Sequence, residues 1–199
     1  MGRKSKNRQR KSRTEKTEAW MWTLLPKLQD QDLDKLTMDE LSTYIGKSKS
    51  TVYEYFQTKE EIILYLAQVV MSPLAEKLFS ENLKRSSYQE EYIHIIEVLG
   101  RGLSGVSTHL LDQMKRNFPG VWDAIDGFIN HVLNKISKIY KHGMEAGEFQ
   151  VYNIDLLLAL DRHFVSSIIT DASDNLLYEQ VNFLIEEYLN LRLNGLKKA

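Results

Sequence analysis

The sequence predicts an all-α protein, and the supporting observations are few helix breakers, enough apolar residues for a core, and no strand pattern. The 199 residues include three prolines and ten glycines, and 43% of them are hydrophobic. This composition suits a folded chain with a sizeable core and favours helices over a strand-rich, turn-rich fold. Strict alternation of apolar and polar residues never extends over more than a few positions. At this length the chain can form one large domain or two small ones.

The N-terminal end of the chain is strongly basic. Residues 1–16 carry eight lysines and arginines against Glu15 alone, a net charge of +7, whereas the rest of the chain carries −8. Residues 1–13 are almost wholly polar, so we expect them to form a disordered arm. A basic arm on an acidic body is typical of a segment that meets a polyanion, with a solvated tail as the alternative.

The first helix is expected to begin directly after this arm, and Pro26 falls inside it. An internal proline removes one hydrogen bond and kinks a helix, so the sequence leaves the course of residues 24–36 open. We expect the basic arm over residues 1–13, a three-helix domain over residues 14–58, and a larger helical domain over residues 59–199.

Two short helices separated by a tight turn follow the first helix. Thr37 and Glu40 have the spacing of a capping box, and the helix that they begin ends at Gly46. Ser48 then caps a further short helix that runs to about Tyr55. Helix, tight turn and helix within so few residues form the helix-turn-helix pattern.

This segment carries a resemblance to a known family. The run GKSKSTVYEYF from Gly46 to Phe56, followed by Lys59 and two glutamates, resembles the helix-turn-helix signature of TetR-family transcriptional regulators. The resemblance implies a sequence-specific regulator that binds pseudo-palindromic, double-stranded operator DNA as a homodimer. It also implies an N-terminal helix-turn-helix domain and a C-terminal helical domain for ligand binding and dimerisation. Repression relieved by a small-molecule effector is the more usual mode in the family, although the sequence itself does not decide between repressor and activator.

The first turn of the second short helix consists of the polar residues Ser48, Lys49, Ser50 and Thr51. In helix-turn-helix proteins this turn enters the major groove. Two tyrosines beyond it can place hydroxyls on the DNA backbone. Lys59 resembles the family's phosphate-contacting lysine. The candidate DNA-contacting residues are Thr37, Lys47, Ser48, Lys49, Ser50, Thr51, Tyr53, Tyr55 and Lys59.

Two residues in this region depart from what the family and the chemistry favour. Lys47 stands where the family prefers an apolar residue, so its stem is expected to pack while its charge reaches a phosphate. Glu54 is unusual beside an anionic ligand. It can accept a hydrogen bond from cytosine N4 or face solvent.

Long apolar helices are expected over residues 121–145, 154–169 and 176–196. The resemblance implies that the last two pair with those of a second copy in a four-helix bundle. One stripe on the final helix has suitable spacing, although an intramolecular core stripe would look the same. Its members are Leu177, Val181, Leu184, Tyr188 and Leu191. A helix from Lys59 to about Lys77 is expected to link the two domains mechanically.

A surplus of large apolar and aromatic side chains across these helices predicts a pocket for a mostly apolar small-molecule effector, with a few polar anchors. Each of these residues could equally belong to the core. The candidate lining residues are Arg101, His109, Met114, Phe118, Trp122, Phe128, Tyr140, His163 and Phe164. Asp161 and Arg162 also interrupt an apolar helix, and they could sit at the dimer interface or line the pocket.

The rival hypothesis is a nucleotide-binding enzyme, because Gly100–Gly105 matches the letters G-x-G-x-x-G. A true dinucleotide fingerprint needs a βαβ unit around it. Ile95, Ile96 and Leu99, which precede it, fit helical spacing instead. We therefore expect a helix loosened by glycine, in a protein that is not an enzyme.

Several classes of site find no support in the sequence. The chain has no cysteine, which excludes disulfides, thiolate metal sites and cysteine nucleophiles. The five histidines show no close metal-ligand spacing, so no metal and no cofactor are expected. No apolar run approaches the roughly 18 residues of a membrane span. A cytoplasmic protein without a membrane partner is therefore expected.

Overall fold

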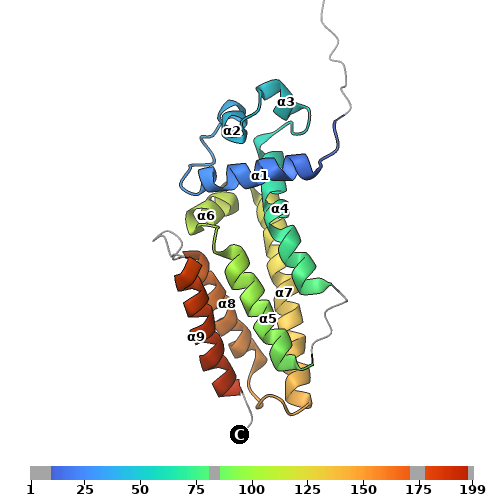
Figure 1. Ribbon diagram of the computed structural model, residues 1–199, viewed down its shortest axis with the longest axis vertical. Coiled ribbons are helices and arrows are strands. Elements are labelled where there is room, and N and C mark those ends of the chain that lie inside the picture. The colour runs from blue at the N-terminus through green and yellow to red at the C-terminus, as the bar shows by residue number, and fades with distance from the viewer. Residues whose placement is uncertain (1–9, 81–85, 171–177, 197–199) are drawn as a thin grey trace, which may run out of the picture.

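The computed structural model describes residues 10–80, 86–170 and 178–196, without the side chains of 168–170 and 178–181. Within these ranges the chain is helical and holds no extended strand. Figure 1 shows α1, α2 and α3 as a small unit at one end of a larger bundle, with α4 running from one into the other. The predicted fold class, an N-terminal helix-turn-helix domain followed by a helical domain, is confirmed.

The first helix, α1 (Glu15–Leu28), crosses the end of the bundle (Figure 1). It continues through Pro26, which lies in its last turn. Proline lacks the N–H that would bond to the carbonyl of the residue four positions earlier. Because Pro26 is so near the end of α1, the loss of this bond leaves the earlier turns intact. The buried face of α1 includes Met21 and Leu24, neither of which has exposed surface. The α1 helix packs against α2 and α4.

The second helix, α2 (Met38–Ile45), begins and ends where the sequence predicts. The Glu40 backbone N–H donates to the Thr37 hydroxyl at 3.2 Å, and the Thr37 N–H donates to the Glu40 carboxylate at 2.8 Å. Gly46 follows with a φ of 74°, a left-handed conformation that glycine adopts without steric cost. The capping box and the glycine together fix both ends of α2.

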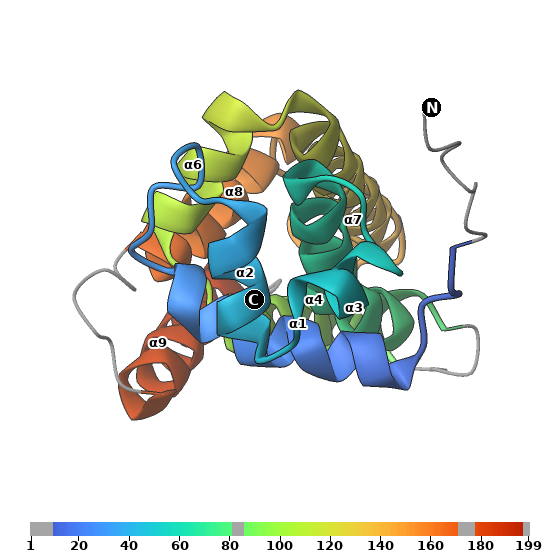
Figure 2. The same cartoon turned by 90° about the horizontal axis from the view of Figure 1, so that it is seen from above.

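The third helix, α3 (Lys49–Tyr53), is shorter than expected. Its start is as predicted, with the Thr51 N–H donating to the Ser48 hydroxyl at 3.2 Å. It ends two residues before the expected Tyr55, because the chain turns inward to bury Phe56, which has no exposed surface. Seen from above, α3 lies over the end of α4 (Figure 2).

The fourth helix, α4 (Lys59–Phe79), links the two units. Among the described helices it is the one that could cross a membrane by length and composition alone, with a mean hydropathy of 1.5. Its apolar side chains are however used in the protein core, where Ile62, Ile63 and Leu66 have no exposed surface. The first half of α4 shares one hydrophobic core with α1, α2 and α3.

Five further helices complete the larger unit: α5 (Tyr88–Leu103), α6 (Thr108–Asn117), α7 (Pro119–Glu145), α8 (Ile154–Thr170) and α9 (Tyr178–Leu196). A second hydrophobic core joins α5, α7, α8 and α9. The short α6 packs on the start of α7 and lies directly beneath α1 (Figure 1). The α6 helix therefore stands between the helix-turn-helix unit and the bundle.

The structure does not support the nucleotide-binding enzyme. Gly100 and Gly102 lie inside α5 rather than in a loop after a strand. A Cβ atom added to Gly102 would lie 2.1 Å from Leu74 Cδ2, so this glycine allows α5 to pack closely on α4. The sequence does not predict the turn over residues 104–107, which separates α5 from α6 and ends at the capping residue Ser107.

A buried carboxylate joins four helices of the bundle. Asp161 of α8 is 1% exposed and accepts hydrogen bonds from Tyr92 of α5 at 2.8 Å and Tyr188 of α9 at 2.6 Å. It also accepts from the Tyr140 hydroxyl of α7 and from Arg192 Nη2 of α9 at 3.1 Å. Burial raises the pKa of all three tyrosines, so their hydroxyls remain protonated donors. We call these five residues the Asp161 cluster.

Candidate nucleic-acid interface and effector pocket

The first turn of α3 presents short polar side chains to solvent. Ser48, Lys49 and Ser50 are exposed, and Thr51 is half-buried. The Ser48 hydroxyl lies 3.0 Å from that of Ser50 and 2.8 Å from that of Thr51. Asp39 of α2 forms an ion pair with Lys49. The Ser50 and Thr51 hydroxyls are bonded to that of Ser48, so they can turn toward base edges while Ser48 continues to cap α3.

Lys47 and the two tyrosines differ in their availability. The Lys47 ammonium lies 5.9 Å from the centre of the Trp20 ring, a cation–π contact that leaves the side chain exposed. Tyr53 is 42% exposed. The Tyr55 ring instead meets Trp20 edge to face at 5.2 Å. Lys47 and Tyr53 can reach a DNA backbone, whereas Tyr55 helps to hold α1.

Two other candidates have structural roles in this conformation. Thr37 is engaged in the capping box of α2. The Lys59 ammonium donates to the carbonyl oxygens of Leu33 and Asp34, each at 2.7 Å, and lies 5.7 Å from the Phe118 ring centre. Lys59 thereby ties the chain between α1 and α2 to the start of α4. The phosphate contact that the sequence predicts for Lys59 stays a prediction, and in this DNA-free conformation its ammonium is held by the two carbonyls.

The described part of the basic arm lies against the helix-turn-helix. Lys11 donates its backbone N–H to the Glu54 carbonyl at 3.0 Å, and its ammonium lies 2.7 Å from the Glu54 carboxylate. Arg10 is paired with Glu61 at 3.1 Å. Residues 1–9 lie outside the described residues. Glu54 is thus partnered by Lys11, a contact that no local sequence pattern reveals.

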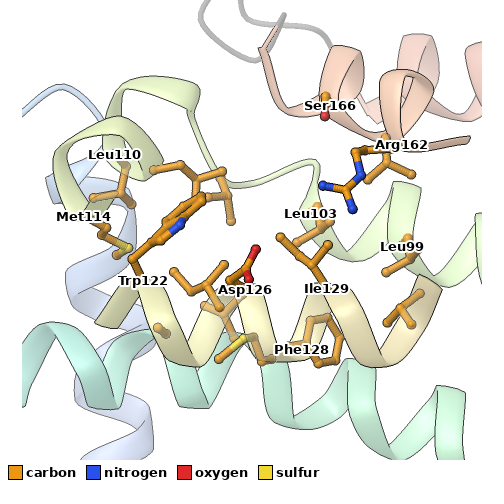
Figure 3. A pocket seen from close by; sticks show the side chains of 18 of the residues that line it. Leu99, Leu103, Leu110, Met114, Trp122, Asp126, Phe128, Ile129, Arg162 and Ser166 are labelled. Carbon is orange, nitrogen blue, oxygen red and sulfur yellow. The ribbon is translucent and has the colours of Figure 1, made fainter. Parts of the chain in front are cut away.

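A largely apolar cavity of about 280 Å³ lies among α4, α5, α6, α7 and α8 (Figure 3). Three predicted lining residues, Met114, Trp122 and Phe128, form part of its wall. Leu25 of α1 also lines it, so the cavity reaches the helix-turn-helix unit directly. The cavity has the apolar character of small-molecule sites.

Six other predicted lining residues do not line this cavity: Arg101, His109, Phe118, Tyr140, His163 and Phe164. The polar ones among them have other surroundings. Arg101 pairs with Glu97 at 3.5 Å, and His163 is exposed. His109 Nε2 lies 3.2 Å from the Gln31 carbonyl oxygen.

The aromatic residues among the six are parts of other contacts. Phe118 lies under the Lys59 ammonium, and Tyr140 belongs to the Asp161 cluster. Phe164 stacks on Tyr188 with ring centres 3.7 Å apart. The sequence predicts these residues to be helical, but it does not tell which face of a helix meets a cavity and which meets another helix.

The polar lining of the cavity comes from other residues. Its polar members are Asp126, Asp161, Arg162 and Ser166. Asp161 and Arg162 are two of the residues that interrupt an apolar helix in the sequence. Asp126 accepts a hydrogen bond from Asn130 at 2.8 Å. Figure 3 shows the Arg162 guanidinium directed toward the cavity, and Arg162 forms no ion pair with any described residue. A cation is therefore available to an anionic group of a ligand.

A set of hydrogen bonds joins the end of α1 to the start of α6. The Gln29 side chain accepts from the Ser107 N–H at 2.6 Å and donates to the Gly105 carbonyl at 3.1 Å. The Ser107 hydroxyl donates to the Gln29 carbonyl at 2.7 Å. We call this set the α1–α6 clamp. Because Leu110 and Met114 of α6 line the cavity, the clamp connects the cavity wall to α1, the first helix of the helix-turn-helix unit.

An exposed polar turn on the second helix of a helix-turn-helix, joined to a larger helical domain, is the arrangement of a helix-turn-helix DNA-binding protein. Residues 28–66 match the family model of the bacterial regulatory proteins of the tetR family. The resemblance to TetR-family transcriptional regulators is thus confirmed.

The chain is similar to several known proteins. An uncharacterised HTH-type transcriptional regulator, YvaF of Bacillus subtilis, is 27% identical over 100 residues, which cover 47% of this chain and half of that protein. The ketosteroid regulator KstR2 of Mycobacterium tuberculosis has a TM-score of 0.74 at 12% identity, over 96% of this chain and 99% of its own. FadR of Bacillus subtilis, solved with stearoyl-CoA, has a TM-score of 0.69 at 17% identity, over 88% and 97%. At these identities the structures establish the fold alone.

Proposed function

We propose that this chain is a cytoplasmic repressor that binds an operator through α3 and is released by a small-molecule effector. Residues 14–58 form the DNA-binding domain, and residues 59–199 bind the effector and dimerise. The exposed polar first turn of α3, within the segment that matches the family model, carries the proposal. Ser50 and Thr51 read bases, while Lys47 and Lys49 contact phosphates.

The proposed homodimer forms through α8 and α9. One short recognition helix contacts too few bases for useful specificity, so a pseudo-palindromic site needs two copies. Large apolar side chains stand exposed on these two helices: Leu156, Leu160, Phe183, Leu184 and Leu191. In the predicted stripe Leu184 and Leu191 are exposed, whereas Tyr188 turns inward to Asp161. Leu177 and the side chain of Val181 lie outside the described residues.

The proposed effector is an amphiphile with an apolar body and an anionic end. The apolar walls of the cavity suit the body, and Arg162 suits the anionic end. Because FadR of Bacillus subtilis was solved with stearoyl-CoA, long-chain acyl thioesters are the first compounds to test.

Effector binding is proposed to act on α3 by two routes. One is α4, whose Leu66 and Val70 line the cavity while its start follows α3. The other is α6, through the α1–α6 clamp. A ligand that favours one placement of these helices changes the spacing of the two α3 helices in a dimer. A coupling of about 1–3 kcal/mol changes operator affinity about 5- to 150-fold.

Selection of randomised duplexes by the full-length protein tests the DNA-binding part of the proposal. The enriched duplexes should contain two inverted half-sites, and Ser50→Ala should change the preferred bases. Lys49→Ala should weaken binding to all duplexes by a similar factor, because phosphate contacts carry no direct sequence information. Lys141→Ala, on the exposed far end of α7, is the control and should change nothing. If no sequence is enriched, the proposed function is wrong.

A further inference from the structure

Glu54 is a negatively charged residue at the end of the helix that is proposed to read DNA. An acid beside phosphates costs binding free energy through like-charge repulsion, so its presence needs an explanation. Its carboxylate is the docking point of Lys11, and its backbone carbonyl receives the Lys11 N–H. These two contacts tie the described start of the chain to the end of α3.

Two neighbouring contacts extend the docking. Arg10 pairs with Glu61 of α4, a carboxylate with 25% exposure. The Arg13 guanidinium lies 4.8 Å from the ring centre of Tyr65 and 5.2 Å from that of Phe56. An exposed ion pair alone contributes about 0–1 kcal/mol, so a single pair would hold little. Consecutive contacts over residues 10–13 share the cost of ordering the backbone and hold the segment together.

We propose that Glu54 and Glu61 position the basic arm beside α3 so that the arm contacts phosphates flanking the bases that α3 reads. This inference rests on the proposed function. Four further basic residues precede the docked segment: Arg3, Lys4, Lys6 and Arg8. A segment fixed at residues 10–13 brings these cations to the DNA with less loss of chain entropy than a free tail. Glu54 thereby increases DNA affinity through the arm although it lowers the local positive charge.

Replacement of Glu54 separates this proposal from simple charge counting. Charge counting predicts that Glu54→Gln tightens DNA binding, because it removes a negative charge next to phosphates. The docked arm predicts the opposite: affinity falls about two- to fivefold, the range of one exposed ion pair. The slope of log affinity against log salt should also fall by about 0.9 for each phosphate contact that the arm loses. The assay is fluorescence anisotropy with a duplex selected by the full-length protein.

Asp39 provides a matched comparison at the same surface. It is paired with Lys49 rather than with the arm, so Asp39→Asn frees a cation and should tighten binding. Thermal unfolding of both variants establishes that they remain folded. Opposite effects of the Glu54 and Asp39 replacements support the proposal, whereas tighter binding by both overturns it.

A second variant tests whether the effect runs through the arm. With Arg3, Lys4, Lys6 and Arg8 all replaced by Gln, Glu54→Gln should no longer weaken binding. The weakening should likewise vanish on a duplex trimmed to the two half-sites without flanks. Persistence of the weakening in either case overturns the proposal. Failure of the unaltered protein to bind any duplex would instead overturn the proposed function.

Discussion

Replacement of Asp161 by asparagine should destabilise the protein more than any other single polar change in the bundle. The carboxylate is 1% exposed and accepts from three tyrosines and Arg192. Asp161→Asn removes the negative charge and leaves the Arg192 cation, 8% exposed, without a buried counter-charge. Breaking a buried pair by removing one partner costs about 3–5 kcal/mol. In urea this corresponds to a midpoint lower by roughly 1–2 M.

Arg192→Met should cost less than Asp161→Asn. The carboxylate then keeps its three tyrosine donors, and the arginine gives up an Nε that has no hydrogen-bond partner among the described residues. Urea unfolding followed by circular dichroism, at one fixed protein concentration because association raises apparent stability, measures both variants. A cost below 1 kcal/mol for Asp161→Asn, or a larger cost for Arg192→Met, would refute the view that the carboxylate organises the cluster.

Further predictions concern the clamp, a cap, a lysine and alkaline pH. Gln29→Ala leaves the Ser107 N–H without its acceptor, so we expect about 1–3 kcal/mol of destabilisation in urea and a weaker effect of stearoyl-CoA on operator affinity. Gly46→Ala, at a φ of 74°, should cost about 1 kcal/mol in thermal unfolding. Lys59→Met should lower the unfolding midpoint while leaving the salt dependence of DNA binding unchanged, because its ammonium serves two carbonyls rather than phosphates. The pKa of each tyrosine in the Asp161 cluster is raised by burial, so the unfolded chain loses these protons first. Stability should therefore fall above about pH 10, by up to about 1.4 kcal/mol per pH unit for each tyrosine, which unfolding at pH 9, 10 and 11 would measure.

The helix-turn-helix could be predicted from sequence because local signals set its boundaries. The Thr37–Glu40 capping box, Gly46 and Ser48 each act within a few residues, and the structure has all of them in the expected geometry. The end of α3 was misjudged because it depends on the burial of Phe56 against other helices, which is a tertiary effect.

The cavity was less predictable than the fold. Helical periodicity marks the apolar face of a helix, but α7 and α8 have neighbours on several sides and their apolar residues divide among them. Phe128 meets the cavity, while Phe164 stacks on Tyr188. The role of Glu54 was equally hidden, since its partner Lys11 lies 43 residues away in the sequence.

The position of Leu25 on the cavity wall bears on how compounds should be screened. One part of the binding surface belongs to α1, and α6 is held in place by hydrogen bonds to Gln29. A fragment that begins at residue 59 would lack that part of the wall and would remove the hydrogen bonds that Gln29 makes with the start of α6. Compounds that bind the intact chain would then be scored as inactive. Screens for the natural effector, or for inhibitors, should therefore use the full chain.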